Sequence, residues 1–291
     1  MDTVVARRAW QLVEPLHAIV YFAPETRAET DALGLRGGWM SYFGCRAAPM
    51  GAVSAAVVTA VFYNFNPAMV ERAIPDAWGY ATPAQLLDAR LRAVDAAMNR
   101  LLGEGAGGED IRAAAALAAV AAAAAHTAGR PLSAANAALP LPDRPHLALW
   151  QALAVLREHR GDGHVTTLLA HRVDPVEAHV LAAAGRRAPA DIIRSARKWT
   201  EQDWSEATER LAARGWLTAD GTLTDAGRAA RADIQTDTDR LALQPYAALG
   251  PDRVDNLLTP LHRLAGAVVA AGGVPTPNPI GTPWPPRDDI T

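Results

Sequence analysis

The chain has 291 residues, half of them hydrophobic, and its 28 basic and 31 acidic residues give a formal charge of −3. This balance excludes a general attraction to nucleic acid or anionic membranes, and the single cysteine excludes an intrachain disulfide and a multi-cysteine zinc site. The start lacks the basic-then-apolar order of a signal peptide. The most apolar run, residues 113–125, is shorter than the roughly 20 residues that span a membrane. We therefore expect a soluble, cytoplasmic protein without a membrane partner.

Apolar residues recur at three- and four-residue spacing along most of the chain, which predicts a mainly α-helical fold. The expected helices, in chain order, cover residues 6–20, 82–102 and 113–125, a segment that begins near His146, and residues 201–214, 225–243 and 252–271. The glycine-punctuated residues 39–51 are expected to be non-helical, and the "RGDGH" run at 160–164 is expected to be a polar turn. The six prolines of residues 275–291 predict an extended tail.

The most specific pattern lies in residues 199–234. A helix that ends at Gly215 is followed by a short hairpin around Asp220-Gly221, and Thr224 or Asp225 can cap the helix after it. Helix, short hairpin and helix is the order found at the end of a winged helix. The expected fold is therefore mainly α, with tandem winged-helix-like units, short β-hairpins and flanking helices.

The prediction of two units in tandem depends on a weak internal repeat. Residues 51–78 can be aligned with residues 173–199 at an offset of 122 positions, although alanine-rich helices also align by chance. The expected organisation begins with an N-terminal winged-helix-like unit that holds the ligand pocket (1–104) and a helical linker (105–141). A C-terminal winged-helix-like unit (142–235), C-terminal helices (236–274) and a proline-rich tail (275–291) follow.

The candidate recognition helix, residues 201–214, is poorly suited to DNA. It holds four acids and two bases, and the hairpin after it carries no Arg or Lys, whereas binding to a phosphate backbone requires positive charge. A basic stripe upstream provides the alternative DNA contacts, which are Arg186, Arg187, Arg194, Arg197 and Lys198. The ordinary role of such a stripe is a solvated helix face.

Three aromatic and polar clusters in the first 70 residues predict a ligand pocket, because an apolar site with a few polar fixings needs such residues. Within them, Arg46 lies among apolar neighbours and needs an anion. Glu25 is the simplest internal partner, and a ligand carboxylate or phosphate is the alternative. The expected ligand-binding residues are His17, Tyr21, Glu25, Tyr42, Arg46, Tyr63 and Asn64. The competing interpretation is plain core packing, with Glu25 near a helix start.

No other motif assigns a cofactor. The histidines His159, His164, His171 and His179 lack a recognised metal-ligand spacing, so we expect no metal site. A haem held by a single histidine leaves no sequence trace and stays open. Cys45 with His17 as its base is a weak candidate for catalysis beside a buried, inert thiol, so the catalytic residues are unknown.

Two resemblances bear on the fold. The run "LAARGWL" (211–217) resembles the recognition-helix end of MarR-type regulators. Over most of its length the chain resembles an actinobacterial family of helix-turn-helix proteins, on the stretches "HAIVYFAPE" (17–25), "YFGCRAAPMG" (42–51), "FYNFNPAMVERAIPDAW" (62–78) and "LREHRGDGH" (156–164). These resemblances imply a helix-turn-helix fold. By analogy with the MarR-type proteins, helices 225–243 and 252–271 can pack on the amino-terminal unit or on a second subunit in a homodimer.

Two functions follow from these patterns. The first is a small-molecule-binding protein, or an enzyme, on a degenerate winged-helix scaffold that does not read DNA. The second is a ligand-responsive, MarR-like transcription regulator that binds DNA. The acidic recognition helix favours the first.

Overall fold

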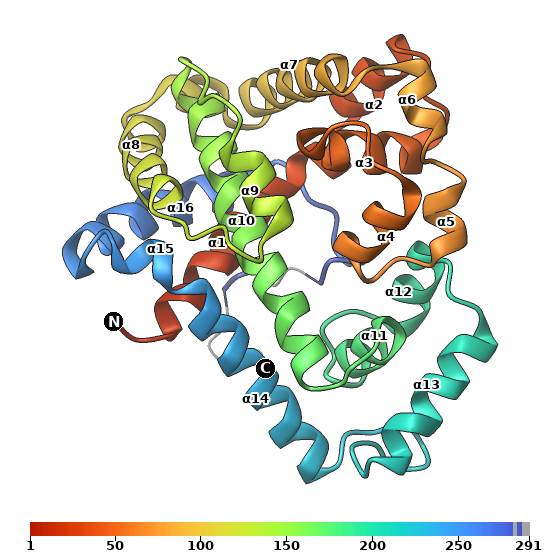
Figure 1. The fold of residues 1–291 in the computed structure, drawn as a ribbon. Helices are drawn as coiled ribbons and strands as arrows, with labels where there is room; N and C mark the ends of the chain where they lie inside the picture. The colour runs from red at the N-terminus through yellow and green to blue at the C-terminus, as the bar shows by residue number, and fades with distance from the viewer. Residues whose placement is uncertain (282–283, 287–291) are drawn as a thin grey trace.

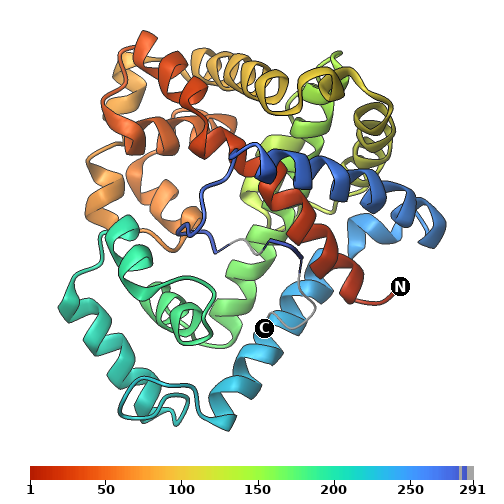
Figure 2. The same cartoon turned by 180° about the vertical axis from the view of Figure 1, so that it is seen from behind.

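The computed structural model describes residues 1–281 and 284–286 and is built from helices joined by short connections (Figures 1 and 2). The helices of the amino-terminal half are α1 (Val4–Phe22), α2 (Pro24–Ala32), α3 (Gly37–Ala47), η1 (Ala48–Met50), α4 (Ala55–Phe62), α5 (Pro67–Glu71), α6 (Asp76–Tyr80), α7 (Pro83–Leu102), η2 (Gly103–Gly107), α8 (Glu109–Ala123) and α9 (Pro131–Ala137). They are followed by α10 (Pro145–Ala170), α11 (Pro175–Ala184), α12 (Ala190–Arg197), α13 (Glu201–Ala213), α14 (Asp225–Ala242), α15 (Gln244–Ala247) and α16 (Pro251–Ala270).

Helix α10 runs through the middle of the molecule, and Figure 1 shows α1, α8, α9 and α14 arranged along it. Most of its residues between His146 and Asp162 are buried, so it has no solvated face over this length. A helix surrounded by other helices must pair any charge that it carries. The charged residues of α10 are therefore candidates for specific contacts with its neighbours.

Three hydrophobic clusters stabilise the fold. The first joins α1, α7, α8, α10 and α16, with Leu16, Trp150 and Leu261 fully buried. The second packs residues of α3, η1, α4, α5, α6, α7 and α9 around Phe43. The third joins the end of α10 to α11, α13 and α14 around Leu211. Burial of apolar surface at about 25 cal/mol per Å² is the main favourable term for such a packing.

The predicted mainly helical fold is confirmed, and several helix ends follow the expected cap chemistry. Thr82 accepts a hydrogen bond from the Gln85 amide and completes a capping box at the start of α7. Gly215 adopts a φ of +70° after α13, a conformation that glycine tolerates best. Thr224 caps α14 through the Gly227 amide.

Two segments expected to be non-helical are helical instead. Residues 37–47 form α3, where Gly44 lets α3 approach α7: a Cβ there would lie 3.2 Å from Leu86 Cδ1. Residues 160–164 lie inside α10, where a Cβ on Gly163 would lie 2.7 Å from Arg130 Nη1. The glycines that suggested breaks thus serve close packing, and this advantage outweighs their poor helix propensity.

The expected β-hairpins are wrong in the described residues, where one antiparallel bridge between Leu217 and Leu223 is all that forms. The segments on either side of the Asp220-Gly221 turn are too short for a ladder, so the strands that winged-helix units require are not made. In α13, Ala207 and Leu211 are fully buried, whereas Trp204 is only partly buried.

The carboxy-terminal helices pack within the chain: α16 lies against α1 and α8, and α14 lies against α10. The described part of the proline-rich tail is non-helical, as expected, and crosses the face of the molecule seen in Figure 2. In the described ranges no single helix has the length and hydropathy to cross a membrane. One pair of helical segments bent by 91° has the length and composition for it, and nothing more: Gly37–Met50 with Ala55–Phe62.

Candidate functional site

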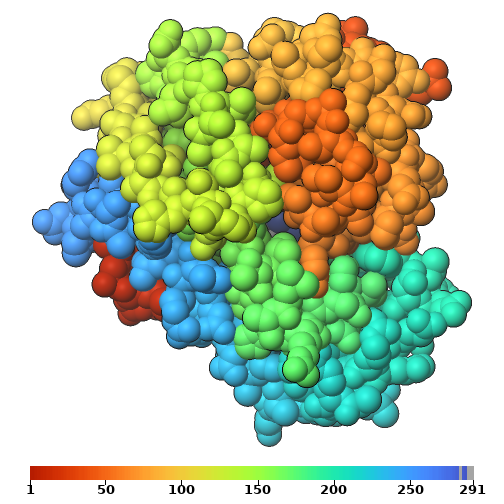
Figure 3. All heavy atoms as spheres, in the orientation of Figure 1, coloured from red at the N-terminus to blue at the C-terminus, as the bar shows by residue number. Residues whose placement is uncertain are grey.

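A cavity of about 540 Å³, here called the large cavity, lies between the two halves of the chain. Its walls come from α1, α3, α4, α10, α11 and α12, and Pro279 and Ile280 of the tail close part of it. Figure 3 shows a hollow between the segment around α9 and α4, with dark-blue atoms of the tail visible inside it. The volume falls within the ordinary range for small-molecule sites.

Aromatic rings and guanidinium groups alternate on the walls of the large cavity. The guanidinium carbon atoms of Arg160 and Arg187 lie 4.3 and 4.9 Å from the ring centre of Trp10. That of Arg197 lies 4.3 Å from the Phe65 ring centre, and that of Arg46 lies 4.1 Å from the Phe62 ring centre. Stacking of this kind holds an arginine in place while its edge stays available for hydrogen bonds.

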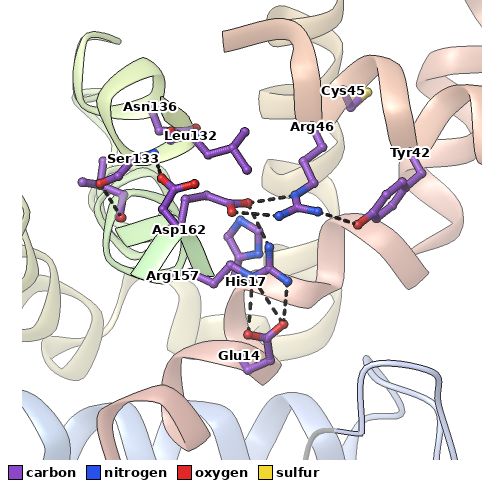
Figure 4. A network of polar contacts seen from close by, with 12 residues as sticks. Glu14, His17, Tyr42, Cys45, Arg46, Leu132, Ser133, Asn136, Arg157 and Asp162 are labelled. Atoms are coloured by element: carbon purple, nitrogen blue, oxygen red, sulfur yellow. Dashed lines mark hydrogen bonds and ion pairs between the residues drawn. The ribbon is translucent and has the colours of Figure 1, made fainter. Parts of the chain in front are cut away.

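Two of the arginines belong to a buried chain of ion pairs (Figure 4). Arg46 binds Glu158 with both ends of its fork, at 3.0 and 2.9 Å, and donates to Tyr42 Oη at 3.0 Å. Arg157 donates to Glu158 at 2.9 Å and to Glu14 at 3.1 Å. Burial alone would raise the pKa of Glu158, but the charges of Arg46 and Arg157 outweigh it and hold the pKa far below the usual range. Both carboxylates are therefore ionised.

The remaining wall arginines have a weaker carboxylate partner or none among the described residues. Arg187 and Arg197 have no carboxylate within ion-pair distance among the described residues, and the Nε atom of each is buried without a hydrogen bond. Arg160 lies 3.9 Å from Asp239, which Arg7 binds more closely at 2.8 Å. Burial lowers the pKa values of Arg160 and Arg197 to about 10, so both stay charged at neutral pH. The large cavity thus has an excess of positive charge.

Two neutral histidines complete the large cavity. His164 Nδ1 lies 2.9 Å from Thr238 Oγ1, and that hydroxyl already donates to Ile234 O, so Nδ1 must be the donor and Nε2 keeps a lone pair. His179 Nε2 donates to Asn64 O at 2.9 Å. Burial, with the nearby arginines, lowers the pKa of both histidines to about 3.

A small cavity of about 160 Å³ lies next to the large one, and the two share Tyr21, Phe22, Gly38, Tyr42 and Arg46. Its other walls include His17, Ser41, Cys45, Arg90, Asn136 and Trp150. Cys45 and His17 are thus brought to one cavity, but burial raises the pKa of the Cys45 thiol to about 11 and lowers that of His17 to about 3. The thiol is therefore protonated and unreactive.

The unpartnered polar atoms of the interior gather at these two cavities. Among the described residues, eight buried side-chain nitrogen and oxygen atoms lack a hydrogen-bond partner, and seven of them belong to cavity-lining residues. They belong to His17, Thr26, Arg90, Asn136, Arg160, Arg187 and Arg197. Because buried polar groups are nearly always paired in folded proteins, the concentration of these atoms in the residues that line the two cavities is unusual.

Comparison with known families supports the fold assignment. Residues 6–275 match the model of a helix-turn-helix family. The chain belongs to this family. No curated protein and no solved structure matches it significantly.

The fold brings four of the predicted ligand residues together. His17, Tyr21, Tyr42 and Arg46 line the small cavity, and all but His17 also line the large one, as does Asn64. Their role as ligand contacts stays a prediction.

Two predicted residues lie elsewhere. Glu25 binds Arg100 at 2.5 and 2.9 Å near the surface, because α2 directs it toward α7, so the expected Arg46–Glu25 pair is wrong. Tyr63 donates to Val173 O at 2.5 Å and lines neither cavity.

The candidate DNA contacts do not form one exposed stripe. Arg187 and Arg197 line the large cavity, and Arg194 pairs with Glu201 at 3.0 Å. Arg186 and Lys198 are exposed, both with positive φ. On α13, Arg210 pairs with Asp174 and Glu177, and Arg214, the residue that follows this helix, donates to the carbonyl groups of His171 and Arg172.

Sequence reasoning missed Glu14, Arg157 and Glu158, although a signal was present. Each lies within an apolar helical segment, where a charge is expensive unless it meets an opposite one. The "RGDGH" run was interpreted as a polar turn, whereas the structure continues α10 through it. The described residues hold no group of three or more His, Cys, Asp or Glu that could bind a metal.

Proposed function

We propose that this helix-turn-helix protein binds an anionic small molecule with a flat, apolar body in the large cavity. The observation that carries the proposal is the pair Arg187 and Arg197, which are partly buried at the wall with their Nε atoms shielded from solvent, stacked on aromatic rings, and without carboxylate partners among the described residues. An uncompensated buried charge costs several kcal/mol, and a ligand carboxylate, sulfonate or phosphate would remove that cost.

The rest of the wall defines the body of the ligand. Trp10, Trp39, Phe62 and Phe65 line the cavity and make its wall apolar and aromatic. The neutral His164 can accept a hydrogen bond at Nε2, so a ligand hydroxyl or amide suits it. A flat aromatic acid satisfies both features, and a haem, with two carboxylates and an iron for His164, belongs to the same class. The absorption spectrum of the purified protein tests the haem directly.

Binding of 8-anilinonaphthalene-1-sulfonate tests the proposal without knowledge of the natural ligand. We expect its fluorescence to rise on binding, and we expect N-phenyl-1-naphthylamine, which has the same rings without the sulfonate, to bind much more weakly. Arg197→Gln should weaken sulfonate binding about 10- to 100-fold, because a hydrogen bond to a charged group contributes about 1.5–3 kcal/mol. The measurement is a fluorescence titration.

Arg194→Gln is the matched control, since Arg194 lies on the same helix but pairs with Glu201 instead of lining the cavity. Its affinity for the sulfonate should equal that of the unmodified protein. Equal binding of the two dyes, or equal effects of the Arg194 and Arg197 substitutions, would refute the proposal.

The second candidate is a MarR-like transcription regulator, which membership in a helix-turn-helix family favours. In that case the large cavity would hold the effector, and the segment from α12 to α14 would be a degenerate winged helix that contacts DNA. Since the Arg residues of α13 are bound to acids and carbonyl groups of the chain, we expect affinity for duplex DNA no better than roughly 10⁻⁶ to 10⁻⁴ M at physiological salt. A salt-dependent gel shift with DNA flanking the gene measures this; nanomolar, sequence-selective binding would establish the regulator instead.

A further inference from the structure

We propose that the small cavity is a separate anion site, which takes a small oxyanion or carboxylate group on Arg90. Arg90 is 5 % exposed and projects from α7, and its guanidinium carbon lies 5.0 Å from the Trp150 ring centre. Its hydrogen bonds, to Cys45 O and to Gln151 Oε1, are both long at 3.4 Å, and its Nε atom has none. A buried guanidinium with such weak contacts is incompletely compensated.

The charges around Arg90 do not balance within the described residues. Glu158 is bound by Arg46 and Arg157, and Glu14 is bound by Arg157. Three buried arginines, Arg46, Arg157 and Arg90, therefore share two carboxylates, and Arg90 is the one without a direct ion pair. One added negative charge would balance the group.

Two other polar side chains of the small cavity have an atom without a hydrogen-bond partner among the described residues. His17 is 4 % exposed and Asn136 is 3 % exposed, and the His17 Nδ1 and Asn136 Oδ1 atoms have no hydrogen-bond partner. A neutral imidazole can donate to an anion oxygen, while Asn136 Oδ1 needs a donor, because the amide nitrogen of Asn136 is already bound to Leu132 O. Hydrogencarbonate, or a carboxylate with one water molecule, offers both acceptors and a donor.

The anionic group can come from two sources. It can be a free ion, or it can be a second anionic group of the molecule in the large cavity, since Tyr21, Tyr42 and Arg46 form walls of both cavities. Both sources present the same chemistry to Arg90. The proposal does not depend on occupancy of the large cavity, because the charge imbalance at Arg90 exists without it.

Formate is the probe for the site. At fixed pH and ionic strength, sodium formate should raise the midpoint of thermal unfolding in a saturable way. Sodium gluconate should not, because the cavity is too small to hold its hydrated polyol chain. Equal midpoints in the two salts would overturn the proposal, since a water-filled cavity has no preference between them.

Two variants locate the effect. Arg90→Met keeps most of the side-chain length without the charge, and Asn136→Asp places a carboxylate in the small cavity; both should abolish the formate-specific shift. Arg92→Met is the control, because Arg92 lies on the same helix and binds Glu29 at the surface. A formate shift that persists in both Arg90→Met and Asn136→Asp would show that formate binds elsewhere and would overturn the assignment. If Arg90→Met does not fold, the Asn136→Asp variant decides.

A sulfonate titration in the presence and absence of formate separates the two sources. Competition would show that the anionic group belongs to a ligand of the large cavity, and independent binding would show a separate ion. A failure of the dye to bind at all would count against the proposed function and leave the formate result unaffected.

Discussion

Glu158→Gln is expected to destabilise the protein by about 3–5 kcal/mol, the cost of removing one partner from a buried ion pair. Glu158 is 2 % exposed and is the carboxylate shared by Arg46 and Arg157. A neutral amide can accept from one guanidinium but cannot offset two positive charges, so both arginines would be left under-compensated. Urea unfolding followed by circular dichroism measures the change in the free energy of unfolding.

Glu25→Gln provides the comparison, because Glu25 is also bound by an arginine, Arg100, but that arginine is about half exposed. Exposed pairs contribute about 0–1 kcal/mol, so this variant should remain close to the unmodified protein. A Glu158→Gln cost below about 1 kcal/mol would mean that the ion-pair chain does not stabilise the fold.

The free energy of unfolding should also fall as the pH is lowered from about 6.5 toward 3. Burial lowers the pKa values of His17 and His179 to about 3, whereas histidines in the unfolded chain titrate near 6.5. Between pH 6.5 and pH 3 the unfolded state binds protons that the folded state does not bind, and this difference favours unfolding. At pH 5 each histidine should account for about 2 kcal/mol of lost stability relative to pH 8.

Asp162 acts in the opposite direction. Burial raises its pKa to about 7, so the folded state takes up this proton before the unfolded chain does, and stability is gained as the pH falls through 7 toward 4. His179→Gln, which keeps a donor for Asn64 O, should remove about 2 kcal/mol of the loss at pH 5. Asp162→Asn should make the loss steeper.

His262→Gln is the control for these variants, because His262 is exposed on α16. Its unfolding profile with pH should match that of the unmodified protein. Identical profiles for His179→Gln and His262→Gln would show that His179 titrates normally and is not held neutral by burial.

The sequence predicted the helices well because helix periodicity and caps are local signals. Thr82, Gly215 and Thr224 stand where their caps form. Glycine was misleading at Gly44 and Gly163, because its usual cost to a helix is outweighed by contacts with residues far along the chain, Leu86 and Arg130. No local sequence pattern distinguishes a glycine that ends a helix from a glycine that lets another segment pack closely against the helix.

The candidate site was predicted in part for the same reason. The need of Arg46 for an anion followed from its apolar surroundings, but its partner, Glu158, lies 112 positions away, and only the fold reveals such a pairing. Arg187 and Arg197 were assigned to a solvated face because a charge turned inward is normally too costly. They are the exception because they face a cavity and stack on Trp10 and Phe65.

The position of Pro279 and Ile280 in the wall of the large cavity has a consequence for biosynthesis. Among the described residues, every other member of that wall precedes residue 198, so about 80 residues separate the last of them from this closing segment. At a translation rate of about 5–20 residues per second, this closing segment is synthesised roughly 4–16 s after the other walls. A ligand present in the cell can therefore be enclosed as the chain is completed, before it would have to displace the finished segment.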